Sequence, residues 1–223
     1  MRINIHFNTK NLSVNRVIRF LVISDLFFWG GWGLINPIFA LFVVQKISGT
    51  SAFTVGAAFA LYWIVKALFQ IPVSLYLDRH EGEHDDFHAL ILGLALAGFA
   101  AMAFLIVKSV LGLYVVMILQ ALAYGLYTPS WSAIFSRHLD KDHYSFDWAL
   151  DSTTVGIASG IAAFIGGAIA KLFGFEAVFI LTSLFSLTSA ALLFFIPNLI
   201  LPKATMSKQP ILPDHTPGKP NSA

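Results

Sequence analysis

The stretch GLINP at residues 33–37 returns as GLYTP at residues 125–129, at an offset of 92 residues. Both copies lie inside long apolar stretches, of which the chain has six. The same offset aligns the second stretch with the fifth and the third stretch with the sixth. Each is about long enough, at ~1.5 Å per helical residue, to cross a hydrocarbon layer of ~30 Å. Because each repeat holds three spans, an odd number, the second copy must be inverted relative to the first, as in many membrane transporters. The six stretches are residues 17–44, 53–77, 89–107, 111–135, 148–172 and 177–196.

The composition places the chain in a membrane. Of 223 residues, 57% are hydrophobic and 12% are charged, and the mean hydropathy is +0.75; such values exclude an ordinary soluble domain. The apolar stretches lack the alternation of a membrane β-barrel. A net charge of +2 is too small to indicate nucleic-acid binding, and a chain without cysteine has no disulfide or thiolate metal site. We therefore predict an all-α, polytopic membrane protein with six transmembrane helices in two inverted three-helix repeats.

Lysine and arginine indicate the orientation of the chain. Ten of them lie on the side of the N-terminus and three on the opposite side. The positive-inside rule then predicts a multi-pass protein of the plasma (inner) membrane with both termini in the cytoplasm. The predicted parts are a cytoplasmic N-terminal segment at residues 1–15, a transmembrane domain at 16–201 and a disordered cytoplasmic tail at 202–223, which is polar and rich in proline.

Two polar and aromatic stripes occupy equivalent places in the repeats. Residues three or four apart share one face of a helix, and the offset equates Trp32 with Tyr124 and Asn36 with Thr128. Aromatic rings beside amides and hydroxyls are typical of a small-molecule cavity, although interfacial belts or plain packing explain single rings equally well. The predicted cavity residues are Trp29, Trp32 and Asn36 in the first span and Gln120, Tyr124, Thr128 and Trp131 in the fourth.

Asp25 shares the face of the first stripe, several turns inside its span. A carboxylate there costs roughly 2.5–3.5 kcal/mol unless it faces protein or water. Lys66 is the other charge well inside the spans, and its long stem could cover much of the difference in depth between the two. We predict that Asp25 and Lys66 carry a coupling or substrate charge; the alternative is a structural ion pair between the first two spans.

The cytoplasmic start of the fifth span carries Asp147 and Asp151, one turn apart. We expect them to act in a gate or in the structure, with Arg79 or Arg137 as partners. Further along this span, four glycines predict close helix packing, namely Gly156, Gly160, Gly166 and Gly167.

Two sequence patterns typical of enzymes occur in the chain. Residues 80–84 read HEGEH, which matches the zinc-peptidase pattern HExxH, and His88 follows one turn later. The match lies in a short acidic loop with a glycine inside it, where a zinc site would need one stable helix. Ser159 suggests an intramembrane serine protease, but every histidine lies outside the spans, so no buried serine–histidine pair can form. We predict no enzyme, no cofactor and no metal.

Three local patterns are familiar from one family. SLYLDR at residues 74–79 stands where that family has G-x-L-x-D-R, and LQALAYG at 119–125 resembles its fourth-span L-Q-G-x-G stretch. IGGA at 165–168 with GFEAVF at 174–179 resembles the end of its fifth span and the turn into the sixth. Over residues 16–201 the chain thus resembles the N-terminal six-helix half of a major facilitator superfamily transporter.

The resemblance implies a secondary transporter, or half of one, that moves a small solute by alternating access. It places Asp78 and Arg79 at a cytoplasmic gate, to which we add Asp151. Members of the family have twelve spans in two halves with the substrate between them. The implied partners are the lipid bilayer, a small-molecule substrate, a coupling proton, and either a second copy of the chain or a separate six-helix half.

Several positions depart from the family pattern. Ser74 replaces the first glycine of the loop signature, and Glu81 and Glu83 stand where basic residues normally follow. Met117 stands at the place of the coupling arginine, and residues 162–163 are two alanines in place of the antiporter Gly-Pro. The best-known route of drug–proton exchange is therefore not expected. The alternative functions are a non-transporting membrane scaffold or truncated transporter remnant, and a membrane metal protein that uses the histidines of residues 80–88.

Overall fold

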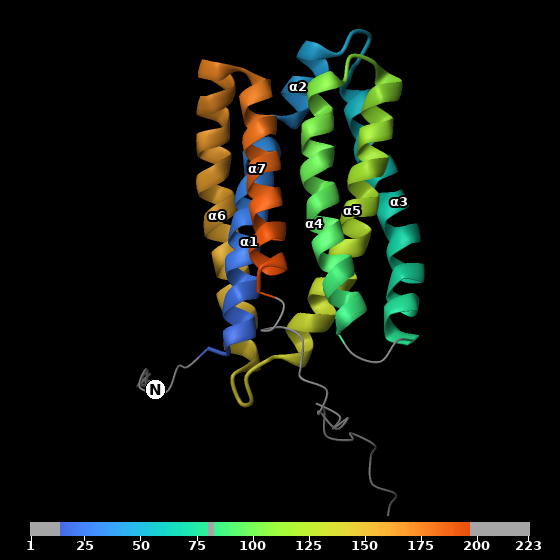
Figure 1. Ribbon diagram of the computed structural model, residues 1–223. Helices are drawn as coiled ribbons and strands as arrows, with labels where there is room; N and C mark the ends of the chain where they lie inside the picture. The colour runs from blue at the N-terminus through green and yellow to red at the C-terminus, as the bar shows by residue number, and fades with distance from the viewer. Residues whose placement is uncertain (1–13, 80–82, 197–223) are drawn as a thin grey trace, which may run out of the picture.

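The computed structural model describes residues 14–79 and 83–196, and those residues form an all-helical bundle without strands (Figure 1). Six of its helices are long and apolar enough to cross a membrane, which confirms the predicted fold class. The first span is divided into two helices, and the third ends in a short 3-10 turn. The elements are α1 (Arg16–Ile35), α2 (Phe39–Lys46), α3 (Ala52–Arg79), α4 (His84–Ala103), η2 (Phe104–Ile106), α5 (Val110–Arg137), α6 (Tyr144–Phe173) and α7 (Phe175–Phe194).

Local signals in the sequence mark the helix ends. The Asn15 side chain accepts a hydrogen bond from the Val17 backbone N–H at 2.9 Å and caps α1. Ser109 caps α5 in the same way by accepting from the Gly112 N–H at 3.1 Å. Gly174, with φ of 87°, makes the tight connection between α6 and α7. α1 begins and α7 ends on the same side of the bundle (Figure 1).

The helix pairs obey the inverted repeat. α1 packs against α6 and α7, and the equivalent helix α5 packs against α3 and α4, while α4 and α7 pack against each other. The offset also holds for single contacts. A Cβ on Gly31 of α1 would lie 2.8 Å from the Cβ of Phe185 on α7, and a Cβ on Gly93 of α4 would lie 2.9 Å from the carbonyl oxygen of Ala123 on α5. The offset makes position 31 equivalent to 123 and position 93 equivalent to 185. The same close helix crossing therefore occurs twice, with the glycine on α1 in the α1–α7 contact and on α4 in the α4–α5 contact.

The two proline motifs differ in conformation. Residues 36–38 form a turn between α1 and α2, whereas Pro129 lies inside the continuous helix α5. A proline removes one backbone hydrogen bond, which a helix packed among others in a membrane can tolerate. Only the first of the two motifs therefore interrupts its span.

The glycines of α6 do not all serve helix packing. A Cβ on Gly166 would lie 2.3 Å from the carbonyl oxygen of Leu34, so this glycine allows α1 and α6 to approach closely. No atom of the described residues lies within 4 Å of such a Cβ on Gly156, Gly160 or Gly167. Within the described bundle the prediction is therefore wrong for these three, because they point away from the line along which α6 touches α1.

One flank of the bundle is open. α3 packs mainly against α5, and α6 packs mainly against α1 and to a smaller extent against α7. α3 and α6 do not pack closely against each other, so each helix has one uncovered side. They are the least buried of the six membrane-spanning helices. Phe53 and Leu68 on α3 and Phe164 on α6 are largely exposed. These apolar faces suit lipid or another helical unit, and they lie on either side of the cavity described next.

Candidate functional site

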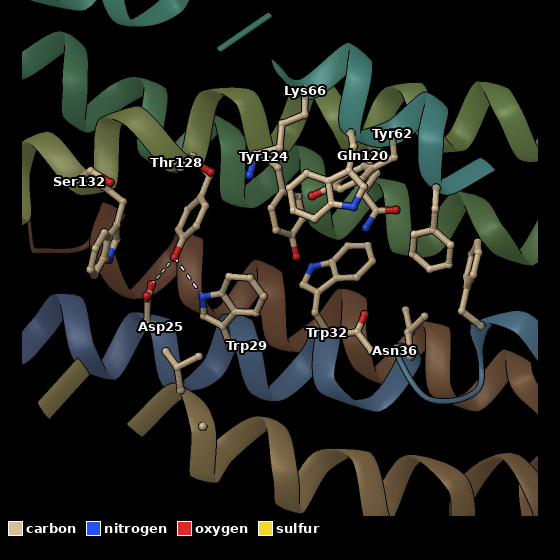
Figure 2. A pocket seen from close by; sticks show the side chains of 18 of the residues that line it. Asp25, Trp29, Trp32, Asn36, Tyr62, Lys66, Gln120, Tyr124, Thr128 and Ser132 are labelled. Carbon is tan, nitrogen blue, oxygen red and sulfur yellow. Dashed lines mark hydrogen bonds between the residues drawn. The ribbon is translucent and has the colours of Figure 1, made fainter. Parts of the chain in front are cut away.

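A cavity of about 580 Å³ lies between α1, α3, α5 and α6 (Figure 2). It extends from Asp25 to Phe39 along the first span and from Met117 to Ser132 along α5. The structure brings together all the residues of the two predicted stripes at its wall. They are Trp29, Trp32, Asn36, Gln120, Tyr124, Thr128 and Trp131.

Tyr124 is the centre of the aromatic wall. Its ring centroid lies 5.7 Å from that of Trp32, 6.0 Å from that of Trp29 and 5.8 Å from that of Tyr62, with the planes nearly perpendicular. Such edge-to-face pairs stabilise the packing of large side chains. These ring pairs connect α1, α3 and α5 around the cavity. Ring contacts therefore fix the positions of a large part of the cavity wall.

Asp25 is 2% exposed and belongs to a hydrogen-bonded chain that crosses the cavity wall. The Tyr127 hydroxyl donates to Asp25 Oδ1 at 2.8 Å, and the Trp29 indole N–H donates to the Tyr127 hydroxyl at 3.2 Å. The dashed lines of Figure 2 mark these two bonds. A buried carboxylate is tolerated when such donors surround it, so Tyr127 and Trp29 set the position of this charge.

Lys66 lines the cavity from α3 but makes no ion pair with Asp25. Its ammonium lies 5.1 Å from the centroid of the Trp63 ring and 5.9 Å from that of the Tyr124 ring. A cation over ring faces at these distances is attracted by the electron-rich surface. The structural alternative, an ion pair that locks the first two spans together, is therefore wrong.

Asp151 lies in the cavity wall together with Ser152, Val155 and Gly156 of α6. It is 7% exposed. One turn earlier, Asp147 Oδ2 accepts a hydrogen bond from the Asp140 backbone N–H at 2.7 Å. The structure thus separates the two aspartates, one beside the cavity and one against the loop before α6.

Arg137 and Arg79 are not partners of these aspartates. Arg137 pairs with Asp86 and lies 3.8 Å from Glu83, at the end of α5 and the start of α4. Asp78 and Arg79 end α3 and are exposed. The predicted gate residues Asp78, Arg79 and Asp151 therefore occupy two different places, and their gating role remains a prediction.

The HEGEH pattern falls partly outside the described residues, because residues 80–82 are not described. His84 begins α4, and the His88 ring nitrogen Nδ1 lies 2.5 Å from the His84 carbonyl oxygen. Within residues 14–79 and 83–196, no group of three or more histidine or acidic side chains is arranged to hold a metal ion.

Sequence reasoning missed part of the site. Tyr127, which holds Asp25, lies within the repeated motif and three residues after Tyr124, a spacing that marks it as a member of the same helix face. Phe59 and Tyr62 on α3 were not predicted, yet they precede the predicted Lys66 at intervals of three and four residues, and all three line the cavity. That periodic signal could have placed α3 at the wall.

The chain was compared with known proteins. The profile of the Major Facilitator Superfamily matches residues 21–217. An uncharacterized MFS-type transporter of Methanocaldococcus jannaschii is 23% identical over 149 residues, which are 67% of this chain and 37% of that protein. The crystal structure of the POT family transporter PepTSo aligns with a TM-score of 0.73 at 16% identity, over 88% of this chain and 40% of that one.

The chain thus spans about two fifths of the length of these two proteins. The structural match shows that the six-helix arrangement is shared, and the profile match extends over most of the chain. Together with six helices that can span a membrane, these findings identify an integral membrane protein. The chain belongs to the Major Facilitator Superfamily.

Proposed function

We propose that the chain is a six-helix unit of a secondary transporter, and that a small solute binds in the cavity between its repeats and crosses the membrane by alternating access. The observation that carries this proposal is the cavity itself. Two polar and aromatic stripes from equivalent helices of inverted repeats face one space, with a buried carboxylate in its wall. Packing alone would not require a charge there, since burying one is costly.

The open flank supports a second six-helix unit as partner. The apolar faces of α3 and α6 border the cavity and remain largely exposed. Because the chain covers 37% and 40% of its two relatives, the complete transporter would consist of this unit with a separate half or with a second copy. Either partner would cover the flank and close the cavity on that side.

Charged residues take distinct roles in this proposal. Asp25, held by Tyr127, carries the coupling or substrate charge and exchanges a proton or a charged solute with the cavity. Lys66 adds a cation on the opposite wall, where the rings of Trp63 and Tyr124 hold it. Asp78 and Arg79 act at the cytoplasmic gate, with both chain termini in the cytoplasm. Asp151 joins the gate as the cavity closes from that side.

The absence of cysteine makes the proposal directly testable. Single cysteines replace Asn36 and Ser132, which lie towards opposite ends of the cavity (Figure 2). Each variant is reconstituted into liposomes and exposed to a membrane-impermeant maleimide from the outside or from the lumen. Phe164→Cys, on the exposed apolar face of α6, serves as the lipid-facing control.

Alternating access predicts that positions 36 and 132 each react from both sides, because each end opens in turn. The control position reacts slowly from either side. If each cavity position reacts from one side only, the cavity does not alternate, and the chain acts as a non-transporting membrane scaffold.

A further inference from the structure

Two carboxylates share the cavity, on different helices. Asp25 of α1 and Asp151 of α6 both line it and are 2% and 7% exposed. Asp25 accepts a hydrogen bond from Tyr127, but Asp151 Oδ1 is buried without any hydrogen-bond partner among the described residues. Two ionised carboxylates buried in the wall of one cavity are unfavourable unless a positive charge accompanies them.

The described part of the chain does not supply that positive charge. Lys66, the basic residue of the cavity wall, lies over the rings of Trp63 and Tyr124 and forms no ion pair. Arg137 is engaged with Asp86 and Glu83 at the end of α5. With two aspartates and one lysine, the wall carries an excess of negative charge when all three are ionised.

The rest of the wall defines the chemistry of a complementary cation. A metal ion such as Mg²⁺ or Ca²⁺ needs about six or more oxygen ligands, whereas nine of the 21 residues that line the cavity are aromatic. Trp29, Tyr124 and Trp131 line the same cavity and offer faces that attract a diffuse positive charge and accept an apolar body. The volume of about 580 Å³ suits a drug-sized molecule.

We propose that the cavity selects an organic cation with an apolar body, whose positive charge lies between Asp25 and Asp151. The indole N–H groups of Trp32 and Trp131 are buried without hydrogen-bond partners among the described residues and would donate to any acceptor atom that the molecule carries. This inference rests on the proposed function in one respect, since it takes the bound cation to be the transported solute. It gives Asp151 a binding role in addition to its predicted place at the gate.

A pair of ions with the same shape and opposite charge tests the proposal on the unchanged protein. The full chain in a neutral detergent is titrated by calorimetry with tetraphenylphosphonium and, separately, with tetraphenylborate, each against a protein-free micelle blank. We expect the cation to bind at least ~30-fold more tightly than the anion, since a buried charge contact is worth roughly 2 kcal/mol or more. Equal affinities, tighter binding of the borate, or no binding of the phosphonium would overturn the proposal.

Variants then locate the charge. Asp151→Asn and Asp25→Asn should each weaken phosphonium binding by about tenfold or more. Asp142→Asn removes the same charge from an exposed turn with φ of 66°, where asparagine is well tolerated, and should leave the affinity unchanged. An unchanged affinity in Asp151→Asn would contradict the shared site. If a variant does not fold, the affinities of the unchanged protein for the phosphonium and the borate still test the proposal.

The outcomes separate this inference from the proposed transport. Selective binding of the cation, combined with thiol reaction from one side only at positions 36 and 132, would keep the cation site and refute transport. Thiol reaction from both sides, combined with no preference for the cation, would keep transport and refute the cation site.

Discussion

The Tyr127 hydroxyl of α5 lies 2.8 Å from Oδ1 of Asp25 on α1, and this hydrogen bond joins the equivalent helices of the two repeats across the wall of the cavity. The backbones of α1 and α5 approach each other at few points, since each packs mainly against helices of the opposite repeat. Side chains make the contact, through this bond and ring pairs such as Trp32–Tyr124. The bond therefore couples the position of the buried charge to the relative position of the repeats.

The Tyr127–Asp25 bond should contribute measurably to stability. Tyr127→Phe leaves Asp25 Oδ1 and the Trp29 N–H without their partner, and we expect a loss of about 1–3 kcal/mol in the free energy of unfolding. Thermal unfolding in detergent of Tyr127→Phe, Asp25→Asn and the double variant measures the coupling between the two side chains. Strictly additive effects would show that they do not interact. Tyr114→Phe, which loses a hydroxyl without a hydrogen-bond partner in the described residues, is the control.

Two adjacent glycines of α6 should respond differently to the same added methyl group. Gly166→Ala places a Cβ 2.3 Å from the Leu34 carbonyl oxygen, whereas the Cβ of Gly167→Ala meets nothing within 4 Å. Overpacking of this kind costs about 1–3 kcal/mol, so Gly166→Ala should lower the unfolding temperature and weaken the packing of α1 on α6. Gly167→Ala should keep the unfolding temperature of the parent. Equal effects of the two substitutions would place the α1–α6 crossing elsewhere.

Buried serines of α7 offer a second matched pair. Ser189 Oγ donates to the Ser24 carbonyl oxygen at 2.8 Å and lies 2.7 Å from Ser24 Oγ, which links α7 to α1. Ser186 is also fully buried but its hydroxyl has no partner in the described residues. Ser189→Ala should cost ~0.6–1.7 kcal/mol, the range for hydrogen bonds between membrane helices. Ser186→Ala should be neutral or stabilising, because it removes an unpaired polar group. A larger loss for Ser186→Ala would contradict the α1–α7 contact described above.

A charged cluster at the start of α4 predicts a dependence of stability on pH. Burial raises the pKa of Glu83 above its ordinary value of 4.5, although the neighbouring His138 and Arg137 act in the opposite direction. The folded protein therefore holds a proton at Glu83 more tightly than the unfolded chain does. Its stability should fall as the pH rises from below 4.5 through the raised pKa.

Glu83→Gln removes this titration and should flatten that decline, so that the variant is at least as stable as the parent at neutral pH. Unfolding temperatures between pH 4 and pH 8 measure the difference, and His138 is common to both proteins. Glu176→Gln at the exposed start of α7 is the control and should follow the parent curve. A variant that is less stable than the parent at neutral pH would show that Arg137 and His138 outweigh the burial of Glu83.

The fold and much of the cavity wall follow from periodicity. The spans are read from apolar length, and the stripes of α1 and α5 are read from spacings of three and four, because both features depend on one helix at a time. The motif of residues 125–129 also contains Tyr127, but nothing in its spacing shows that its hydroxyl reaches Asp25 on another helix.

Contacts between helices were harder to predict. Depth along the membrane suggested that Lys66 and Asp25 could meet, yet the Lys66 ammonium lies over the rings of Trp63 and Tyr124 within the same cavity. The orientation of single residues was equally hard to predict, since Gly166 touches α1 and Gly167 does not. One residue along a helix is a turn of about 100°, so small differences in position decide which side chains meet.

The α1 and α5 stripes are expected to face a water-filled cavity between the repeats. The most direct measurement compares the rates at which a charged, water-soluble thiol reagent modifies Thr128→Cys in the cavity wall and Phe164→Cys on the exposed face of α6, in liposomes. We predict fast reaction at position 128 and slow reaction at position 164. Slow reaction at position 128, with no faster rate than at position 164, would show that water does not reach the stripe and that no aqueous cavity lies between the repeats.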